Sequence, residues 1–210
     1  MKRWMACALG AMALLAVSSV GAAELVEGRD YTRLNSPPPT DRKIEVIEFF
    51  SYGCPHCNDL EPYLQAWVKK VPPDVQFRRV PVMFQERWQS LAKVYFTLEA
   101  MGEDQRLSPE VFKAIHVAGL PLYQDKAFFD WAASNGLDRA KVMDVYKSFG
   151  VESKMKRALA TAKDYNIQSV PTMLVDGKFL TSSDRIGGHA AVPGALDALI
   201  AKARAERPKT

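Results

Sequence analysis

The stretch of sequence that decides the fold is residues 49–57, Phe-Phe-Ser-Tyr-Gly-Cys-Pro-His-Cys. An apolar run ends here in a short turn, and the turn leads into a segment that carries Cys54 and, three positions later, Cys57. Pro55 suits the first position of a helix, where the N–H group that proline lacks is not needed. The order of residues therefore predicts a strand, a turn, and then a helix with Cys54 at its N-terminus.

The N-terminus of a helix favours a thiolate. Unpaired backbone N–H groups and the positive end of the helix dipole face the Cys54 sulfur there. His56 is a nearby donor or cation, and the Cys57 thiol can share a hydrogen with the Cys54 sulfur, so we expect a low Cys54 pKa. Cys54 and Cys57 are thus the candidate catalytic pair, with Cys54 exposed and Cys57 shielded, and Pro55 and His56 are candidates for tuning the thiolate.

The N-terminal sequence predicts export. Two basic residues precede an apolar run over residues 5–17, and small residues follow it. This pattern is typical of a secretory signal peptide over residues 1–22, with cleavage after Ala22 or Ala23. The apolar run is too short for a membrane span, and no later segment of the sequence is long enough either. We therefore expect a soluble exported protein.

Removal of the signal peptide would change the cysteine count and the charge. Cys7 would leave with it, so that Cys54 and Cys57 would be the only cysteines of the exported chain. The formal net charge would fall from +4 to +2, because Lys2 and Arg3 would leave as well. So small a charge favours neither a nucleic acid nor a membrane surface as a partner.

The spacing of the two cysteines favours redox chemistry over a structural role. A disulfide that closes so small a loop constrains the unfolded chain little. A zinc site needs four ligands, and neither His116 nor His189 lies at a paired spacing, so no metal is expected and both histidines are expected to be structural or exposed. Covalent haem is excluded because Asn58, and not histidine, follows the second cysteine.

Hydrophobic patterning predicts two groups of strands separated by a long run of helices. The first group forms a βαβ unit whose central strand is apolar on both faces, as in a parallel sheet. Helical periodicity lasts over residues 88–166, with Ser108 opening one helix and Gly150 ending another. A hairpin with an Asp176-Gly177 turn and a last amphipathic helix follow. The strands are expected at residues 31–34, 43–51, 75–83, 171–175 and 178–181, and the first helix at residues 55–70.

With this order of elements, several motifs resemble the DsbA family of periplasmic thiol-disulfide oxidants, which have a thioredoxin fold. They are Cys54-Pro55-His56-Cys57 behind Glu48-Phe49-Phe50-Ser51, then Val170-Pro171, and Asp176-Gly177-Lys178 in the hairpin. The resemblance covers nearly all of the chain after the signal peptide. It implies an α/β protein: a thioredoxin-fold domain, residues 24–84 plus 167–210, with a helical subdomain, residues 85–166, inserted between its βαβ and ββα halves.

The resemblance also implies an activity. The Cys54-Cys57 disulfide would be donated by thiol-disulfide exchange to reduced exported proteins in the periplasm, with no cofactor besides this disulfide. A DsbB-type membrane oxidase, linked to quinone, would reoxidise the pair. A cis Val170-Pro171 bond would face the disulfide, where Val170 backbone groups would bind an extended substrate. The protein is expected to be monomeric.

Glu48 is an acid inside an otherwise apolar strand. Two roles stay open for it: a buried acid that relays a proton for Cys57, or a structural partner of Arg78 or Arg79 on the neighbouring strand. The family more often has lysine near the place of Arg79. Glu61, a turn beyond Cys57, is expected to be a solvated charge.

Three alternatives fit parts of the same pattern. A disulfide isomerase of the DsbC type needs an N-terminal dimerisation module, for which the short segment before Cys54 leaves little room. A reductase of the same fold would need a reducing electron source and commonly has another dipeptide between its cysteines. A non-catalytic chaperone-like or metal-binding module would keep its binding after Cys54→Ser, whereas an oxidant would lose its activity.

Overall fold

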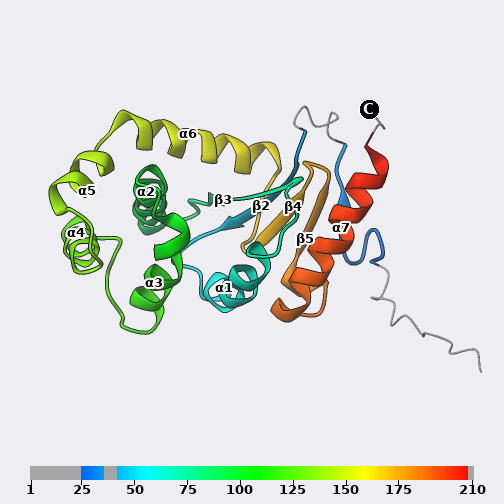
Figure 1. The fold of residues 1–210 in the computed structure, drawn as a ribbon, viewed down its shortest axis with the longest axis horizontal. Helices are drawn as coiled ribbons and strands as arrows, with labels where there is room; N and C mark the ends of the chain where they lie inside the picture. Colours follow the sequence, from blue (N-terminus) through cyan, green and yellow to red (C-terminus); the bar gives the residue numbers. More distant parts are fainter. Residues whose placement is uncertain (1–24, 36–41, 208–210) are drawn as a thin grey trace, which may run out of the picture.

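The computed structural model describes residues 25–35 and 42–207. The predicted signal peptide lies outside them. The described chain forms a five-stranded sheet with helices against it and a lobe of further helices to one side (Figure 1). This is the predicted α/β class, a thioredoxin fold with a helical insertion between its two halves. Within the described part of the chain, no helix is long and apolar enough to cross a membrane.

The sheet is built around its most buried strand. The strand order is β1-β5-β4-β2-β3, and β2 lies parallel to β3 and antiparallel to β4. Nearly every residue of β2 is buried, as its continuous apolar run predicted. The short β1 pairs antiparallel with β5 at one edge, which confirms the expected edge strand. The strands are β1 (Thr32–Arg33), β2 (Ile44–Phe50), β3 (Val75–Pro81), β4 (Thr172–Val175) and β5 (Phe179–Ser182).

Helices pack on both faces of this sheet. On one face α1 and α7 contact each other and cover Val46 of β2 and Met173 of β4. On the other face α6 crosses β3, and Ile47 of β2 belongs to the larger core that fills the helical lobe (Figure 1). The helices are α1 (Pro55–Val68), α2 (Glu86–Ala100), α3 (Asp104–His116), α4 (Asp125–Ser134), α5 (Arg139–Tyr146), α6 (Phe149–Asp164) and α7 (Val192–Glu206), with two short 3-10 turns, η1 (Ser183–Arg185) and η2 (His189–Ala191).

Two predicted helix boundaries are wrong. Ser108 does not open α3, because α3 begins at Asp104. The Ser108 hydroxyl is buried and lies 2.7 Å from the Tyr52 hydroxyl, so this serine packs in the core and does not cap a helix. Gly150 does not end α5, because Ser148 caps α6 by accepting a hydrogen bond from the Val151 N–H. Glycine therefore stands in the first turn of α6. The exact limits of the two predicted domains stay a prediction.

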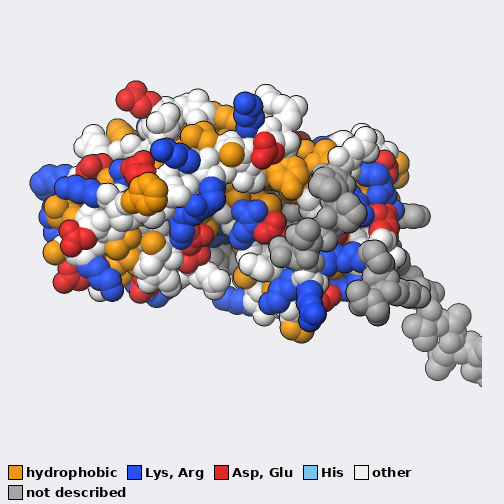
Figure 2. Space-filling view, turned by 90° about the horizontal axis from the view of Figure 1, so that it is seen from above, with side chains coloured by type: hydrophobic (Ala, Val, Ile, Leu, Met, Phe, Trp, Pro, Cys, Tyr) orange, Lys and Arg blue, Asp and Glu red, His pale blue; other side chains and the backbone are white. Residues whose placement is uncertain are grey.

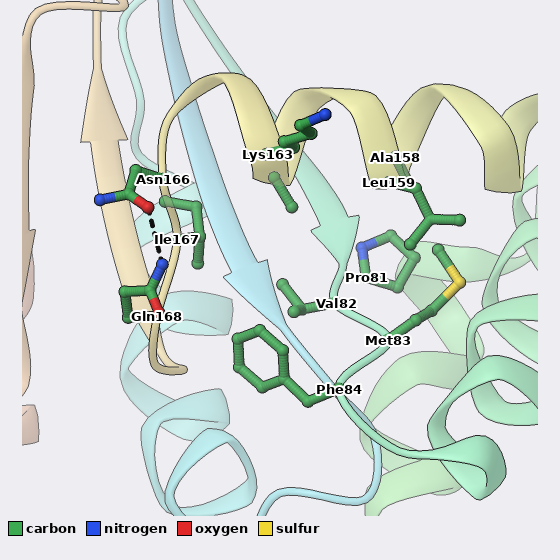
Figure 3. Close-up of a pocket in the computed structure, with 11 residues that line it drawn as sticks. Pro81, Val82, Met83, Phe84, Ala158, Leu159, Lys163, Asn166, Ile167 and Gln168 are labelled. Atoms are coloured by element: carbon green, nitrogen blue, oxygen red, sulfur yellow. Dashed lines mark hydrogen bonds between the residues drawn. The ribbon is translucent and has the colours of Figure 1, made fainter.

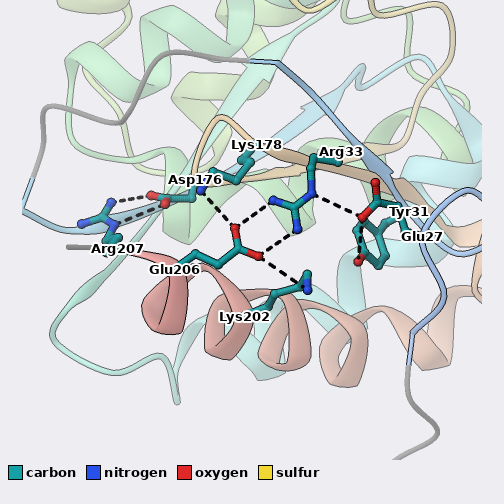
Figure 4. A network of polar contacts seen from close by, with 8 residues as sticks. All are labelled: Glu27, Tyr31, Arg33, Asp176, Lys178, Lys202, Glu206 and Arg207. Carbon is teal, nitrogen blue, oxygen red and sulfur yellow. Dashed lines mark hydrogen bonds and ion pairs between the residues drawn. The ribbon is translucent and has the colours of Figure 1, made fainter. Parts of the chain in front are cut away.

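The hairpin turn has the expected geometry. Asp176 and Gly177 have φ angles of 57° and 63°, the left-handed pair that a type I′ turn requires. Ion pairs then join this hairpin to the end of the chain (Figure 4). The Glu206 carboxylate of α7 accepts two hydrogen bonds of 2.8 Å from Arg33 of β1 and one of 3.2 Å from Lys178. These groups are partly exposed, so their contribution to stability is modest.

A buried ion triad joins β2, β3 and α1. Arg79 of β3 donates hydrogen bonds to Glu48 of β2 at 2.7 Å and to Glu61 of α1 at 2.5 Å. All three side chains are less than a tenth exposed. Glu61 is thus not the solvated charge that its position in the sequence predicted, because α1 turns it inward onto Arg79. Arg78, on the other side of the strand, pairs instead with Glu45 near the surface.

We expect Arg79→Leu to lower the free energy of unfolding by about 3–5 kcal/mol, because two carboxylates would stay buried without their cation. Arg78→Leu is the matched control: it removes the next arginine of the same strand from a half-exposed ion pair, which contributes about 0–1 kcal/mol. Urea unfolding of both variants at pH 7 measures the difference. Equal losses in the two variants would contradict a structural role for the triad.

Candidate active site

The site is built on the start of α1. Cys54 is the N-cap residue, with extended backbone angles, and Pro55 occupies the first turn, as the sequence predicted. The preceding turn is held by Ser51, whose carbonyl accepts from the Cys54 N–H at 3.0 Å and whose hydroxyl accepts from the Gly53 N–H at 3.1 Å. The end of β2 therefore delivers the Cys54 sulfur to the positive end of the helix.

The two cysteines are free thiols in this structure and differ in burial. Cys57 is fully enclosed, and Cys54 is 5% exposed. The expectation that Cys57 is the better shielded is correct, but Cys54 is much less open than expected. The reason is a segment far along the chain: the Cys54 thiol donates a weak hydrogen bond to the Val170 carbonyl, with 3.6 Å between sulfur and oxygen.

Val170 and Pro171 lie opposite the cysteines, just before β4. The peptide bond between them is cis, as the resemblance implied. Because β4 pairs with β2, the end of the Val170-Pro171 loop is placed beside the strand that leads into Cys54. The loop thereby presents its Val170 carbonyl to the reactive sulfur.

The two thiols have opposite acidities. The Cys57 thiol donates to the Cys54 sulfur, and with the backbone N–H groups of Cys57 and His56 and the charge of His56 this lowers the pKa of Cys54 to about 6, against the effect of burial. Burial raises the pKa of Cys57 well above its usual value, and the hydrogen bond to Cys54 and the charge of Glu48 add to that effect. One sulfur is thus available as a thiolate and the other is kept protonated.

Glu48 is fully buried and lies on the side of the sheet that α1 covers. One of its oxygens accepts from Arg79, and the other, Oε1, has no hydrogen-bond partner in the described part of the chain. Burial raises the pKa of Glu48, although the Arg79 charge acts in the opposite direction. Arg79, and not Arg78, is the arginine that pairs with it. The structure therefore gives Glu48 its structural partner and leaves one oxygen able to take a proton.

His116 and Trp88 support the turn through contacts that the sequence did not predict. A ring nitrogen of His116, at the end of α3, lies 2.8 Å from the Tyr52 carbonyl, and its ring stacks on Phe112. Gly53 lies so close to Trp88 that a Cβ atom there would come within 2.6 Å of the indole nitrogen. His116 therefore has a structural role, and helices of the insertion hold the turn that carries Cys54. No spacing in the sequence links these residues, since only the tertiary packing brings them together.

An apolar hollow of about 240 Å³ lies to one side of the segment that leads into the Val170-Pro171 loop (Figure 3). The segment after β3 lines it with Met83 and Phe84, and Leu159 of α6 lies across from them. Ile167 and Gln168, which lead into the Val170-Pro171 loop, close it. Phe84 and Leu159 are about half exposed, so apolar surface is open to solvent here.

Comparison with known families gives a match over more than half of the chain. The family model described as the DSBA-like thioredoxin domain matches residues 75–191. A thiol:disulfide interchange protein DsbA from Bordetella parapertussis is 39% identical over 200 residues, which cover 93% of this chain and 95% of the relative. Another of the same name, from Pseudomonas aeruginosa, is 36% identical over 211 residues and covers both chains fully.

Solved structures agree with these relatives. The crystal structure of Pseudomonas aeruginosa DsbA superimposes with a TM-score of 0.80 at 38% identity, and the match covers 85% of this chain and 94% of that one. DsbA from Xylella fastidiosa gives a TM-score of 0.79 at 28% identity, with 86% of this chain and 98% of that chain covered. With the cysteine pair at the start of α1 and the cis-proline loop against it, this chain belongs to the DsbA family of thioredoxin-fold proteins.

Proposed function

We propose that the chain donates its Cys54-Cys57 disulfide to reduced exported proteins in the periplasm. It is a thiol:disulfide oxidoreductase, and the observation that carries the direction of transfer is the placement of Cys54 at the N-terminus of α1 beside the Cys57 thiol, which lowers the pKa of Cys54. The predicted signal peptide and the family support export. The redox group is the cysteine pair itself, so the proposed reaction needs no further cofactor.

The reaction moves two electrons from substrate to protein. A substrate thiolate attacks the Cys54 sulfur, the Cys54-Cys57 bond breaks, and the Cys57 sulfur leaves and takes up a proton. A second substrate thiolate then attacks the substrate sulfur of the mixed disulfide and expels Cys54 as a thiolate. The substrate leaves with a new disulfide and the protein leaves as the dithiol. A DsbB-type quinone-linked membrane oxidase would then reoxidise the pair.

The lowered Cys54 pKa favours the reduced protein. For a depressed pKa, the stabilisation is full above the unfolded-state value of about 8.5 and is lost as the pH falls through about 6. At pH 7 it contributes about 1.4 kcal/mol, equivalent to about 30 mV in the oxidising direction. The raised Cys57 pKa contributes nothing at neutral pH, because that thiol is protonated in the folded and in the unfolded reduced protein.

The proposed roles of the neighbouring residues follow from their contacts. Pro55 and His56 tune the Cys54 thiolate from the first turn of α1. The Val170-Pro171 loop binds an extended substrate, which can also contact the apolar hollow beside it. Basic and acidic side chains are mixed over the face that carries α6, as Figure 2 shows, so this face is not the uniformly basic surface that a nucleic acid favours. A monomer suffices for this chemistry.

The rate of Cys54 alkylation by iodoacetamide should follow the ionisation of its thiol. We expect a half-maximal rate near pH 6 and a plateau above about pH 7.5, with Cys57 unmodified because it is buried and protonated. In Cys57→Ala the principal hydrogen bond to the thiolate is lost, so the midpoint should rise. Mass spectrometry of the reduced wild type and of reduced Cys57→Ala, alkylated across the pH range, measures the two midpoints. A wild-type midpoint near 8.5 would contradict the oxidant assignment.

Replacement of the resolving cysteine should capture substrates. Cys57→Ala has no disulfide of its own, so we expect its Cys54 thiolate to attack a disulfide of an exported protein, form a mixed disulfide and expel the other substrate sulfur as a thiol. These mixed disulfides should accumulate, since no Cys57 thiol can attack the Cys54 sulfur and release the bound protein. Cys54→Ser should capture nothing and should not oxidise a reduced unfolded protein. Non-reducing electrophoresis with identification of the bands checks this. Binding of unfolded proteins that survives Cys54→Ser, without disulfide transfer by the wild type, would favour the chaperone-like alternative.

Glu48 is proposed to give and take the proton of Cys57. We expect Glu48→Gln to slow the oxidation of a dithiol peptide by up to about 100-fold, and to remove an inflection from its pH profile between pH 5 and 8. Glu61→Gln is the matched control: it also removes one carboxylate from Arg79, and because the Glu61 charge helps to raise the pKa of Glu48, it should move the inflection to lower pH without removing it. Stopped-flow kinetics of peptide oxidation by both variants, measured across the pH range, test whether Glu48 transfers this proton. Identical profiles would leave Glu48 with a structural role alone.

A further inference from the structure

A second group of side chains gathers at the start of α1. His56, Asp59 and His189 each offer one ligand atom, and these atoms lie within 4.8 Å of one another. His56 and Asp59 are three residues apart and so share a face of α1. His189 begins η2, which packs against α1, and its ring centroid lies 6.1 Å from that of His56. Two of the three histidines of the chain thus meet beside one carboxylate.

The donors in this group are oriented by neighbours. Nδ1 of His189 lies 2.8 Å from the hydroxyl of Ser183, which is buried, so Nε2 is the nitrogen left for a ligand. The η2 turn is fixed to the same serine, because the Gly188 N–H donates to its carbonyl at 2.8 Å. A hydrogen bond that fixes the tautomer and orientation of an imidazole is the usual support of a metal-binding histidine.

The three donors do not satisfy one another. Across residues 25–35 and 42–207 no ion pair joins Asp59 to either imidazole, and the only hydrogen bond of its carboxylate there is a 3.4 Å contact of Oδ1 with the Asn58 amide. His56 and Asp59 are exposed, so both can rotate. Tuning of the Cys54 thiolate accounts for His56 but gives no reason for Asp59 and His189 to be beside it.

We propose that His56, Asp59 and His189 bind a divalent transition-metal ion of the Zn²⁺ class. Two imidazoles and a carboxylate are a ligand set that suits Zn²⁺, Co²⁺ or Ni²⁺ better than Mg²⁺ or Ca²⁺. Bonds of about 2.0–2.2 Å in a tetrahedral site hold the ligand atoms about 3.3 Å apart, so the side chains must close by no more than about 1.5 Å. A fourth position stays open for water or a substrate group.

Such an ion would join α1 to η2 next to the cysteine pair. The site goes beyond the disulfide-donor function and does not depend on it, because none of its ligands is a sulfur. The metal site can be tested separately from the disulfide-donor function in the oxidised protein, where both cysteine sulfurs are held in the disulfide and cannot bind zinc. The sequence predicted no metal here because His189 is far from His56 along the chain, and only the packing of η2 on α1 brings them together.

The test is titration of the oxidised protein, purified without a polyhistidine tag, with ZnCl₂ in a calorimeter at pH 7.5. We expect one ion per chain with a Kd in the micromolar range or tighter. Co²⁺ should give visible d-d absorption of a four- or five-coordinate site without a sulfur charge-transfer band. Absence of binding by the wild type at millimolar ZnCl₂ would overturn the proposal.

Variants assign the ligands. We expect His189→Ala and Asp59→Asn each to weaken zinc binding at least 10-fold, and Ser183→Ala to weaken it by about 10- to 100-fold through loss of the supporting hydrogen bond. His116→Gln is the control, since it removes a histidine outside the group and should leave the Kd unchanged. Circular dichroism checks that each variant is folded. Equal zinc affinity of the wild type and both ligand variants would show that the ion binds elsewhere and would overturn the site.

Discussion

The structure around the active site depends on the burial of Arg79 between two carboxylates. This ion triad connects β2, β3 and α1, the three elements of the first βαβ unit. One cation faces two potential anions, and both are enclosed, so the pKa of Glu48 rises and one of its oxygens is left without a hydrogen bond from the described residues. The triad thereby holds the cysteine helix against the sheet and places a titratable acid beneath it.

The chemical difference between the two cysteines is a consequence of where each stands on the same helix. Cys54, at the N-cap, receives hydrogen bonds from the Cys57 thiol and from backbone N–H groups, which stabilise its thiolate. Cys57, one turn deeper, is desolvated and feels the charge of Glu48. A pair that ionises so unequally has one sulfur suited to accept attack and leave, and one suited to stay protonated. The stabilised Cys54 thiolate, which favours the reduced protein, is the physical basis for donating a disulfide.

The helical insertion contributes to the site as well as to the core. His116 of α3 contacts the Tyr52 carbonyl, and Trp88 of α2 packs against Gly53, so the turn before Cys54 is fixed by helices that come later in the chain. On the other side, η2 brings His189 to His56 and Asp59. The start of α1 is therefore surrounded by groups from the first half, the insertion and the C-terminal half of the chain. The proposed disulfide-donor site and the proposed metal site both lie there.

The sequence by itself determined the strand-turn-helix at residues 49–57 and the cysteine pair, because apolar runs, Pro55 and cysteine spacing are local signals. The thioredoxin fold was implied by the resemblance of these motifs, and of Val170-Pro171, to the DsbA family. The sequence also indicated the Asp176-Gly177 turn, whose left-handed angles depend on two neighbouring residues. Only the tertiary structure decided that Glu61 is buried, that Ser108 serves the core, and that His189 lies beside His56. Burial and pairing of a polar side chain are set by which elements pack against it, and contacts between distant parts of the chain leave no periodic pattern in the sequence.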